Sequence, residues 1–153
     1  MGDIKNLVTR LNHGAQDEVY WLGACDESQI NILENKLNLS LPNELKEFIL
    51  LVGGGGVVGE EISGIVDNDA LAESGGAIYY DTCQCRNEYS LPSDMAVIYF
   101  KDDDVCWCVD CRKNTYGQVV NYDLFSREIS NILAPSFGFF FEEYVRKLHL
   151  YDQ

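Results

Sequence analysis

The amino-acid sequence predicts an α+β fold in which an antiparallel sheet meander is flanked by helices. Apolar side chains recur at helical spacing in the first 52 residues and again over residues 137–148. Between them, residues 95–122 form short strand-like segments separated by polar turns. Helices thus precede and follow the strands rather than alternating with them, which argues against a parallel α/β fold. A length of 153 residues suits a single domain over residues 1–153.

Two amphipathic helices are expected before residue 40. The first covers residues 3–12, and a loop with a possible aromatic anchor at residues 20–22 follows it. The second starts after Asp26, which we expect to cap its N-terminus, with Gln29 completing a capping box. The two apolar stripes are Ile4, Leu7, Val8 and Leu11, and then Ile30, Leu33 and Leu37.

A third helix is predicted to begin at Pro42, because the missing N–H of proline costs nothing at the first helical position. Gly53 should end it. Residues 57–66 are typical of a strand or hairpin. Residues 67–93 carry the weakest pattern, and we expect irregular structure there, with a helical turn at 69–73 and room for one helix. The stripe of the third helix is Leu45, Phe48, Ile49 and Val52.

The sheet is predicted from three strands. Residues 95–100 and 105–110 are rich in strand formers and should pair as a hairpin around the polar turn at 101–104. A second turn at 114–117 leads to a third strand over 118–122. Three strands suffice for a stable sheet when one face is covered.

The last helix, over residues 137–148, has the clearest apolar stripe. Gly138 lies within it and costs about 1 kcal/mol relative to Ala, whereas each large buried side chain contributes roughly 1.5–3 kcal/mol. On its outer face the spacing allows two i, i+4 ion pairs, Glu142 with Arg146 and Glu143 with Lys147. The stripe is Phe137, Phe140, Phe141, Tyr144, Val145 and Leu148.

The charge of the chain limits its partners. It has 25 acidic and 11 basic side chains, a formal net charge of −14. Such a field repels phosphate and anionic lipid, so direct binding to nucleic acid or membrane is disfavoured. A basic protein would be attracted, and it would associate faster at low salt. The charge can equally serve only to keep the protein soluble, and the sequence leaves both interpretations open.

The N-terminal segment does not resemble a signal peptide, and no apolar run reaches the roughly 18 residues that span a bilayer. We therefore expect a cytoplasmic protein whose six Cys are reduced thiols. Structural zinc sites usually use two C-x2-C knuckles, and only Cys108 and Cys111 have that spacing. Strand alternation places Cys106 and Cys108 on one face with Asp110. We expect buried thiols there and at Cys83 and Cys85, and no metal or cofactor.

The sequence contains no pattern that indicates a catalytic site. Gly54, Gly56 and Gly59 spell G-x-G-x-x-G, but they follow a helix and precede a strand, the reverse of a dinucleotide-binding turn. Glu60 and Glu61 would also repel phosphate. The two His residues of the chain are not near a Ser or Cys in a nucleophile context. We expect no catalytic residues, so the glycines serve to let the chain leave the helix.

Acidic side chains are the candidates for partner binding. Three adjacent carboxylates in the 101–104 turn are unfavourable unless water or a basic partner screens them. Others bracket the strand predicted after the glycine run. A solvated turn explains the first group slightly better than a binding surface does. The hypothetical partner-binding residues are Glu60, Glu61, Asp67, Asp69, Asp102, Asp103 and Asp104.

Several of these features occur together in a known order. An Ile and a Glu lie on one helix, then a Leu-Pro, a helix ending in aliphatic residues, paired glycines, a hairpin preceded by Leu91-Pro92, and a helix with Ser-Phe-x-x-Phe spacing. In this respect the chain resembles the SUKH superfamily, over about two-thirds of its length. It departs from the family pattern at Val52, where a polar residue is common, and over residues 70–86. The motif residues are Ile30, Glu34, Pro42, Phe48, Gly53, Gly54, Trp107, Phe137 and Phe140.

The resemblance implies a SUKH-like fold and an immunity role. Bacterial members are made beside a polymorphic toxin, frequently a nuclease, and neutralise it by tight binding. A nuclease cleft is usually basic, so an acidic immunity protein could cover it. The alternative is a scaffold or regulator of the same fold with another protein partner. An enzyme or metal protein is a third, less supported reading.

Overall fold

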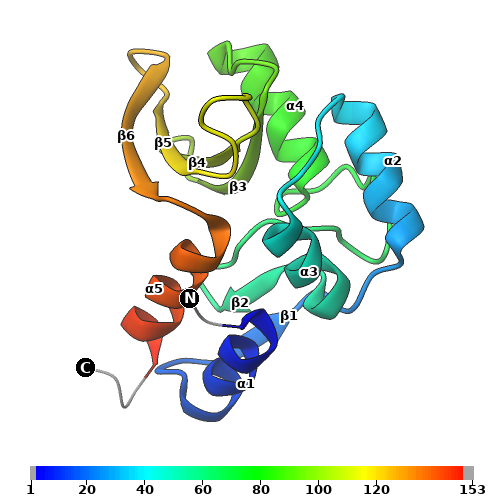
Figure 1. Ribbon diagram of the computed structural model, residues 1–153, viewed down its shortest axis with the longest axis vertical. Coiled ribbons are helices and arrows are strands. Elements are labelled where there is room, and N and C mark those ends of the chain that lie inside the picture. The colour runs from blue at the N-terminus through cyan, green and yellow to red at the C-terminus, as the bar shows by residue number, and fades with distance from the viewer. Residues whose placement is uncertain (1–2, 150–153) are drawn as a thin grey trace.

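The computed structural model describes residues 3–149 (Figure 1). Helices precede and follow an antiparallel sheet, so the predicted α+β class is confirmed. The helices are α1 (Ile4–Gly14), α2 (Glu27–Leu37), α3 (Asn43–Val52), α4 (Ile78–Tyr89) and α5 (Phe137–Leu148). The strands are β1 (Val19–Trp21), β2 (Gly55–Val57), β3 (Met95–Lys101), β4 (Val105–Asp110), β5 (Val119–Asp123) and β6 (Glu128–Ala134).

In the described part of the chain, the main sheet has four strands in the order β3-β4-β5-β6, each antiparallel to the next. The prediction of a three-strand meander was therefore one strand short. The missed strand, β6, lies at the sheet edge and is mostly exposed, so it lacks the apolar alternation that marks a half-buried strand. A second, small sheet pairs β1 with β2, and both strands have only three residues.

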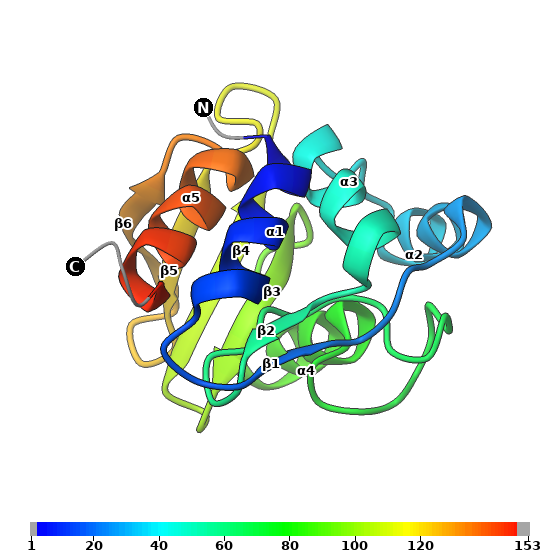
Figure 2. The same ribbon diagram turned by 90° about the horizontal axis from the view of Figure 1, so that it is seen from below.

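Both faces of the main sheet are covered (Figure 2). One face, with Ile98 and Val109, packs into the large core built with α1, α2, α3 and α5. The opposite face, with Val97, Cys106 and Cys108, packs against Cys85 of α4. The alternation predicted within β4 is thus observed. Because helices cover both faces, the sheet buries apolar side chains on each face.

Helix α4 occupies the segment for which we expected irregular structure. The apolar pattern of this helix is weak, because its buried face mixes Ile78 and Cys85 with the polar side chains Asp81 and Thr82. Tertiary hydrogen bonds take the place of an apolar stripe. The Thr82 hydroxyl accepts from the backbone N of Val97 at 2.9 Å, which joins α4 directly to β3.

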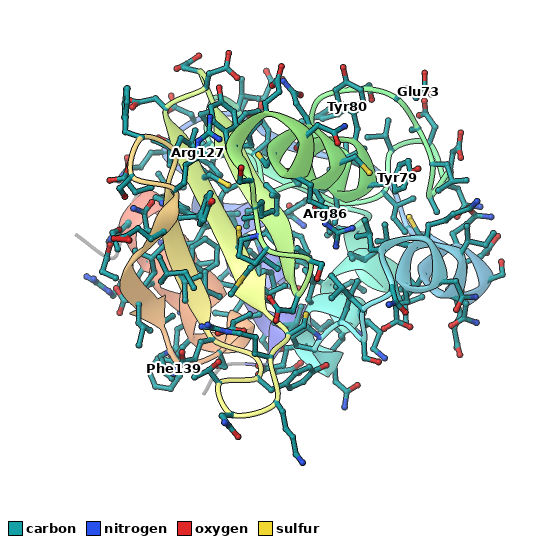
Figure 3. The ribbon with its side chains drawn as sticks, turned by 90° about the horizontal axis from the view of Figure 1, so that it is seen from above. Glu73, Tyr79, Tyr80, Arg86, Arg127 and Phe139 are labelled. Atoms are coloured by element: carbon teal, nitrogen blue, oxygen red, sulfur yellow. The ribbon has the colours of Figure 1, made fainter. Side chains whose placement is uncertain are left out.

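Two arginines join the end of α4 to its neighbours (Figure 3). Arg86, between α4 and α2 in the figure, donates to the carbonyl oxygens of Leu37 at 3.2 Å and Ser93 at 2.8 Å. Arg127, on the other side of α4, donates to the Ser90 hydroxyl at 3.1 Å. Both therefore stabilise carbonyl or hydroxyl groups near helix ends, where cations are favoured.

The predicted capping box of α2 is wrong. Asp26 does occupy the N-cap position, but its side chain makes no capping bond. Its carboxylate accepts from Asn68 Nδ2 at 2.9 Å, and Gln29 Oε1 accepts from the backbone N of Ala70 at 2.9 Å. Both side chains are therefore hydrogen-bonded to the loop after β2 and not to the N-terminus of α2. The prediction for Pro42 was also wrong by one position. Pro42 is the N-cap of α3 and not its first helical residue.

The motif residues of the N-terminal half join α2, α3 and α5. Glu34 Oε2 accepts from the backbone N of Leu41 at 2.7 Å and lies 3.6 Å from Lys46 Nζ, so it connects α2 to α3. The Phe48 ring lies 5.3 Å from that of Phe137 and forms an aromatic pair with it. Ile30 is also fully buried.

The glycine run makes a close backbone contact possible. Gly53 ends α3, as predicted, with φ of 82°. A Cβ on Gly53 would lie 2.1 Å from the carbonyl oxygen of Gly23, and one on Gly54 would lie 2.8 Å from Cα of Gly64. These glycines therefore serve both the positive φ and the packing of three chain segments.

Candidate functional site

A pocket of about 450 Å³ lies between α5 and the sheet. Its volume falls in the roughly 300–1,000 Å³ range of ligand pockets. Strands β3, β4 and β6 form one side, α5 forms the other, and the turn after β2 closes one end. The lining residues are Glu60, Tyr99, Trp107, Leu133, Phe140, Glu143, Tyr144, Lys147 and Leu148.

Two periodicities bring these side chains together. On α5, positions 140, 144 and 148 are four residues apart and lie on one helix face. In the sheet, Tyr99 and Trp107 are paired directly across β3 and β4. Opposed positions of an antiparallel pair have their Cβ atoms about 4.5–5.5 Å apart, so two aromatic rings meet there. The pocket therefore depends on strand register as much as on the helix.

The aromatic rings of the pocket pack against one another. Those of Tyr99 and Trp107 stack with centroids 4.4 Å apart and an interplanar angle of 19°. Phe140 meets Trp107 edge-on at 5.8 Å and 78°. Aromatic pairs of this kind contribute about 0.5–1.5 kcal/mol beyond area burial. The rings are thus held in fixed positions before any ligand binds.

The hydroxyl groups of two tyrosines fix the turn after β2. Tyr99 donates to a carboxylate oxygen of Glu60. Tyr144 donates to the carbonyl oxygen of Glu60 at 2.7 Å and accepts from the backbone N of Val57 at 3.0 Å. Burial raises the pKa of both Tyr99 and Tyr144, so both stay protonated at neutral pH. Gly56 permits this approach, since a Cβ there would lie 2.3 Å from the Tyr144 hydroxyl.

The charged residues of the pocket lie toward solvent. Glu143 is about half exposed and accepts from Arg146 Nη2 at 2.5 Å, an i, i+3 pair. That bond lowers the pKa of Glu143, so its carboxylate is ionised at neutral pH. Lys147 also lines the pocket. The site therefore combines apolar aromatic faces with carboxylates and one lysine among the lining residues described.

Part of the hypothetical acidic surface adjoins this pocket. Glu61 Oε1 lies 3.0 Å from Lys101 Nζ, which joins the turn after β2 to the hairpin of β3 and β4. Burial alone would raise the pKa of Glu61, but hydrogen bonds from the backbone and from Lys101 outweigh it, and the net shift is downward. The hairpin tip, next to Lys101, carries three exposed carboxylates: Asp102, Asp103 and Asp104.

The other predicted acidic residues lie elsewhere. Asp67 and Asp69 belong to a turn whose central residue, Asn68, donates to Asp26 at the start of α2. Asp69 itself accepts from the backbone N of Leu71 at 3.1 Å. The structure therefore brings Glu60, Glu61 and the hairpin tip together, and it places the Asp67–Asp69 turn against α2 instead.

The buried thiols do not form an arrangement suited to chemistry. Sγ of Cys106 lies 3.9 Å from that of Cys85 and 3.7 Å from that of Cys108. Hydrogen bonding to Cys106, followed by burial, raises the pKa of Cys85, and burial raises the pKa of Cys111 to about 12. Protonated buried thiols are poor nucleophiles and ligands. Across residues 3–149, no group of three or more His, Cys, Asp or Glu side chains is placed to hold a metal ion.

The sequence model of the SUKH_5 family, described as SMI1-KNR4 cell-wall, matches residues 4–146. The chain belongs to the SUKH family. A solved structure of a protein from Pseudomonas syringae pv. tomato has the same fold, with a TM-score of 0.66 at 19% identity, over 95% of this SUKH chain and 98% of that chain. No curated protein matches the chain significantly. None of the helices described in this SUKH chain is long and apolar enough to cross a bilayer.

Sequence reasoning named most of the pocket residues, but for other reasons. Glu60 was a candidate contact, whereas Trp107 and Phe140 were family motif positions. The last helix supplied the others: two stripe residues and one predicted ion pair on the outer face, namely Tyr144, Leu148, Glu143 and Lys147. Tyr99 and Leu133 were not singled out. Tyr99 enters the pocket because the β3–β4 register places it opposite Trp107. The sequence indicates the turn of this hairpin, but it does not specify the pairing along the two strands.

Proposed function

We propose that this SUKH-family chain is an immunity protein that binds a cognate protein toxin and neutralises it. The match of the family over residues 4–146 is the observation that carries the proposal. Resemblance to bacterial immunity proteins supplies the role, and the net charge of −14 supplies the class of partner. A toxin that handles phosphate, such as a nuclease, presents a basic face that this charge attracts.

We assign the contact to the acidic surface formed by Glu60, Glu61 and the hairpin tip. Asp102 and Asp103 are exposed at that tip, next to Lys101, whose Nζ pairs with Glu61. Repulsion among three adjacent carboxylates falls when a basic surface docks on them. The Asp67–Asp69 turn, which packs against α2, is a second and separate candidate contact.

A binding role, rather than a catalytic one, is supported by the state of the buried reactive groups. The pKa values of the pocket tyrosines and of the Cys85 and Cys106 thiols are raised, so these groups are protonated at neutral pH. The buried carboxyl of Asp81 is occupied by hydrogen bonds from the Ser63 hydroxyl and the backbone N of Gly76. We propose that these groups stabilise the fold and transfer no protons to a substrate.

Co-expression with the product of the adjacent gene, taken as the candidate toxin, tests the proposal. The wild-type chain should restore growth and should be captured by the toxin in a pull-down that weakens at high salt. A wild-type chain that neither restores growth nor binds would refute the immunity role. Capture of a different protein, without rescue, would favour the scaffold or regulator alternative.

Charge reversal tests the surface. Asp102→Lys with Asp103→Lys should slow association at least tenfold at low salt and reduce its salt dependence, because electrostatic steering is lost. The matched control is Glu27→Lys with Glu47→Lys, which reverses two exposed charges on α2 and α3. Equal association rates for both double variants, measured by stopped flow, would rule out this surface.

A further inference from the structure

We propose that the pocket between α5 and the sheet receives one arginine side chain of the protein partner. This inference rests on the proposed function and makes it specific, because it names the group that the partner inserts. The acidic surface described above provides steering toward a basic protein. The pocket provides a place where a single cation can be held against aromatic faces and paired with carboxylates.

The aromatic walls favour a cation with a flat apolar face. Trp107 and Tyr99 form a stacked pair, and Phe140 meets the Trp107 ring at right angles. A guanidinium over the face of Trp or Tyr is attracted by the negative charge of the ring face, and its plane can stack on the ring. An ammonium lacks such a plane and is more strongly hydrated, so arginine fits better than lysine.

The carboxylates favour a cation over any anion. Glu60 and Glu143 lie at the turn and on α5, two different sides of the pocket. Glu60 is held by the Tyr99 hydroxyl, and Glu143 is ionised beside Arg146. A guanidinium has five donors that match carboxylate oxygens, so it can bond to either of these carboxylates. Phosphate-bearing ligands would be repelled by the same pair.

The protein already places a cation of its own on this aromatic group. Lys101 Nζ lies 5.2 Å from the centroid of the Tyr99 ring and pairs with Glu61. Lys101 therefore already lies against the Tyr99 ring, where it competes with a guest cation. Lys147, which lines the pocket, is a competing cation for a guest arginine.

The two tryptophans give a direct test on the isolated protein. Trp107 lies in the pocket, whereas the indole N–H of Trp21 donates to Asn12 at 2.7 Å, outside the pocket lining. The probe is N-acetyl-arginine N-methylamide, titrated while the two indole N–H signals are followed by NMR. The Trp107 signal should shift saturably, with a dissociation constant on the order of millimolar for so small a ligand, and the Trp21 signal should stay in place.

Matched probes separate guanidinium recognition from other binding. The citrulline analogue is nearly isosteric but neutral, and it should produce no saturable shift. The lysine analogue should bind at least about threefold more weakly. A Trp107 signal that does not respond to the arginine probe, or that responds equally to the citrulline or lysine probe, would overturn the proposal.

Two variants test the charges without removing a core side chain. Glu143→Gln should weaken binding of the arginine probe by about two- to fivefold, and Lys147→Gln should strengthen it by a similar factor. Glu47→Gln, an exposed change of the same type on α3, should leave the affinity unaltered. Equal affinities in all three variants would contradict the assignment of the site.

A failure of the arginine pocket can be distinguished from a failure of the proposed immunity function. If the wild-type chain rescues growth but Glu143→Gln and Phe140→Ala rescue equally well, with unchanged toxin affinity, the immunity role stands and the arginine pocket is wrong. If the wild-type chain does not rescue while the arginine titration succeeds, the immunity role is wrong and the pocket serves another basic protein.

Discussion

Asp81 shows how a single buried residue holds several segments of this protein. Its carboxylate accepts from the Ser63 hydroxyl at 2.9 Å and from the backbone N of Gly76 at 3.2 Å. The residue is only 3% exposed. Burial raises its pKa to about 6, although both hydrogen bonds act in the opposite direction. The protein therefore holds a carboxyl that is costly to ionise where α4 meets the connection that leads from β2.

This pKa shift predicts a pH dependence of stability. Between about pH 4 and pH 6 the folded chain binds more protons at Asp81 than the unfolded chain, so the free energy of unfolding falls as pH rises through that window. The contribution amounts to roughly 3 kcal/mol. In Asp81→Asn this decline should disappear. Urea unfolding of both proteins between pH 4 and pH 7.5 measures it, and parallel curves would contradict the argument.

Tyr144 carries a second prediction at the residue scale. Its hydroxyl bonds the turn after β2 twice, so Tyr144→Phe should lower the free energy of unfolding by about 1–3 kcal/mol, because Val57 N–H loses its buried partner. Tyr20→Phe changes a tyrosine that is 59% exposed and should cost much less. Thermal or urea denaturation compares the two, and equal losses would show that the turn does not depend on this hydroxyl.

At the scale of the elements, the glycine run packs closely, backbone against backbone, on the segment that follows it. The backbone N of Gly55 donates to Ile62 at 2.8 Å and that of Ile65 donates to Gly53 at 2.7 Å. Gly64 lies between these bonds, and a Cβ on it would lie 1.8 Å from the carbonyl oxygen of Gly53. Backbone cannot move aside as a flexible side chain can.

Gly64→Ala should therefore be severely destabilising, by about 4 kcal/mol or more, as expected when a substitution forces a backbone shift. The matched control is Gly75→Ala, where a Cβ would meet no atom within 4 Å. That change should be neutral or stabilising by up to about 1 kcal/mol, because alanine restricts the unfolded chain. Similar melting temperatures for the two variants would contradict the close approach described.

At the scale of the whole molecule, charge is the dominant feature. A net charge of −14 on a chain of 153 residues produces self-repulsion that opposes the compact state. Ion pairs such as Glu61 with Lys101 are partly exposed and offset little of it. The same field steers a basic partner, so stability and association depend on salt in opposite directions.

Raising NaCl from about 0.02 M to 0.3 M shortens the Debye length several-fold, so the melting temperature of the free protein should rise by a few degrees. Over the same range its association with a basic toxin should slow. Sorbitol at equal osmolality is the control for effects that do not depend on charge. A melting temperature that falls with NaCl would show that attractive ion pairs outweigh the repulsion.

Much of the architecture could be predicted because the responsible signals are local. The stripes of α1, α2, α3 and α5 follow helical spacing, and the β3–β4 hairpin follows strand alternation around a polar turn. Helix α4, strand β6 and the cap of α2 could not be predicted. The hydrogen bond that the Thr82 hydroxyl accepts from Val97 N, the position of β6 at a sheet edge, and the contact of Asp26 with Asn68 determine them.

By itself, the sequence determined the fold class, the family pattern and the sign of the charge. Periodicity depends only on residues that are close in the chain, and net charge is a sum over all of them. Only the tertiary structure decided which acidic residues share a surface and which aromatic rings share a pocket. Tyr99, Trp107 and Phe140 come from β3, β4 and α5, so their meeting depends on strand register and on the docking of α5. Such contacts join residues that are distant in the chain, and only the packed core places them side by side.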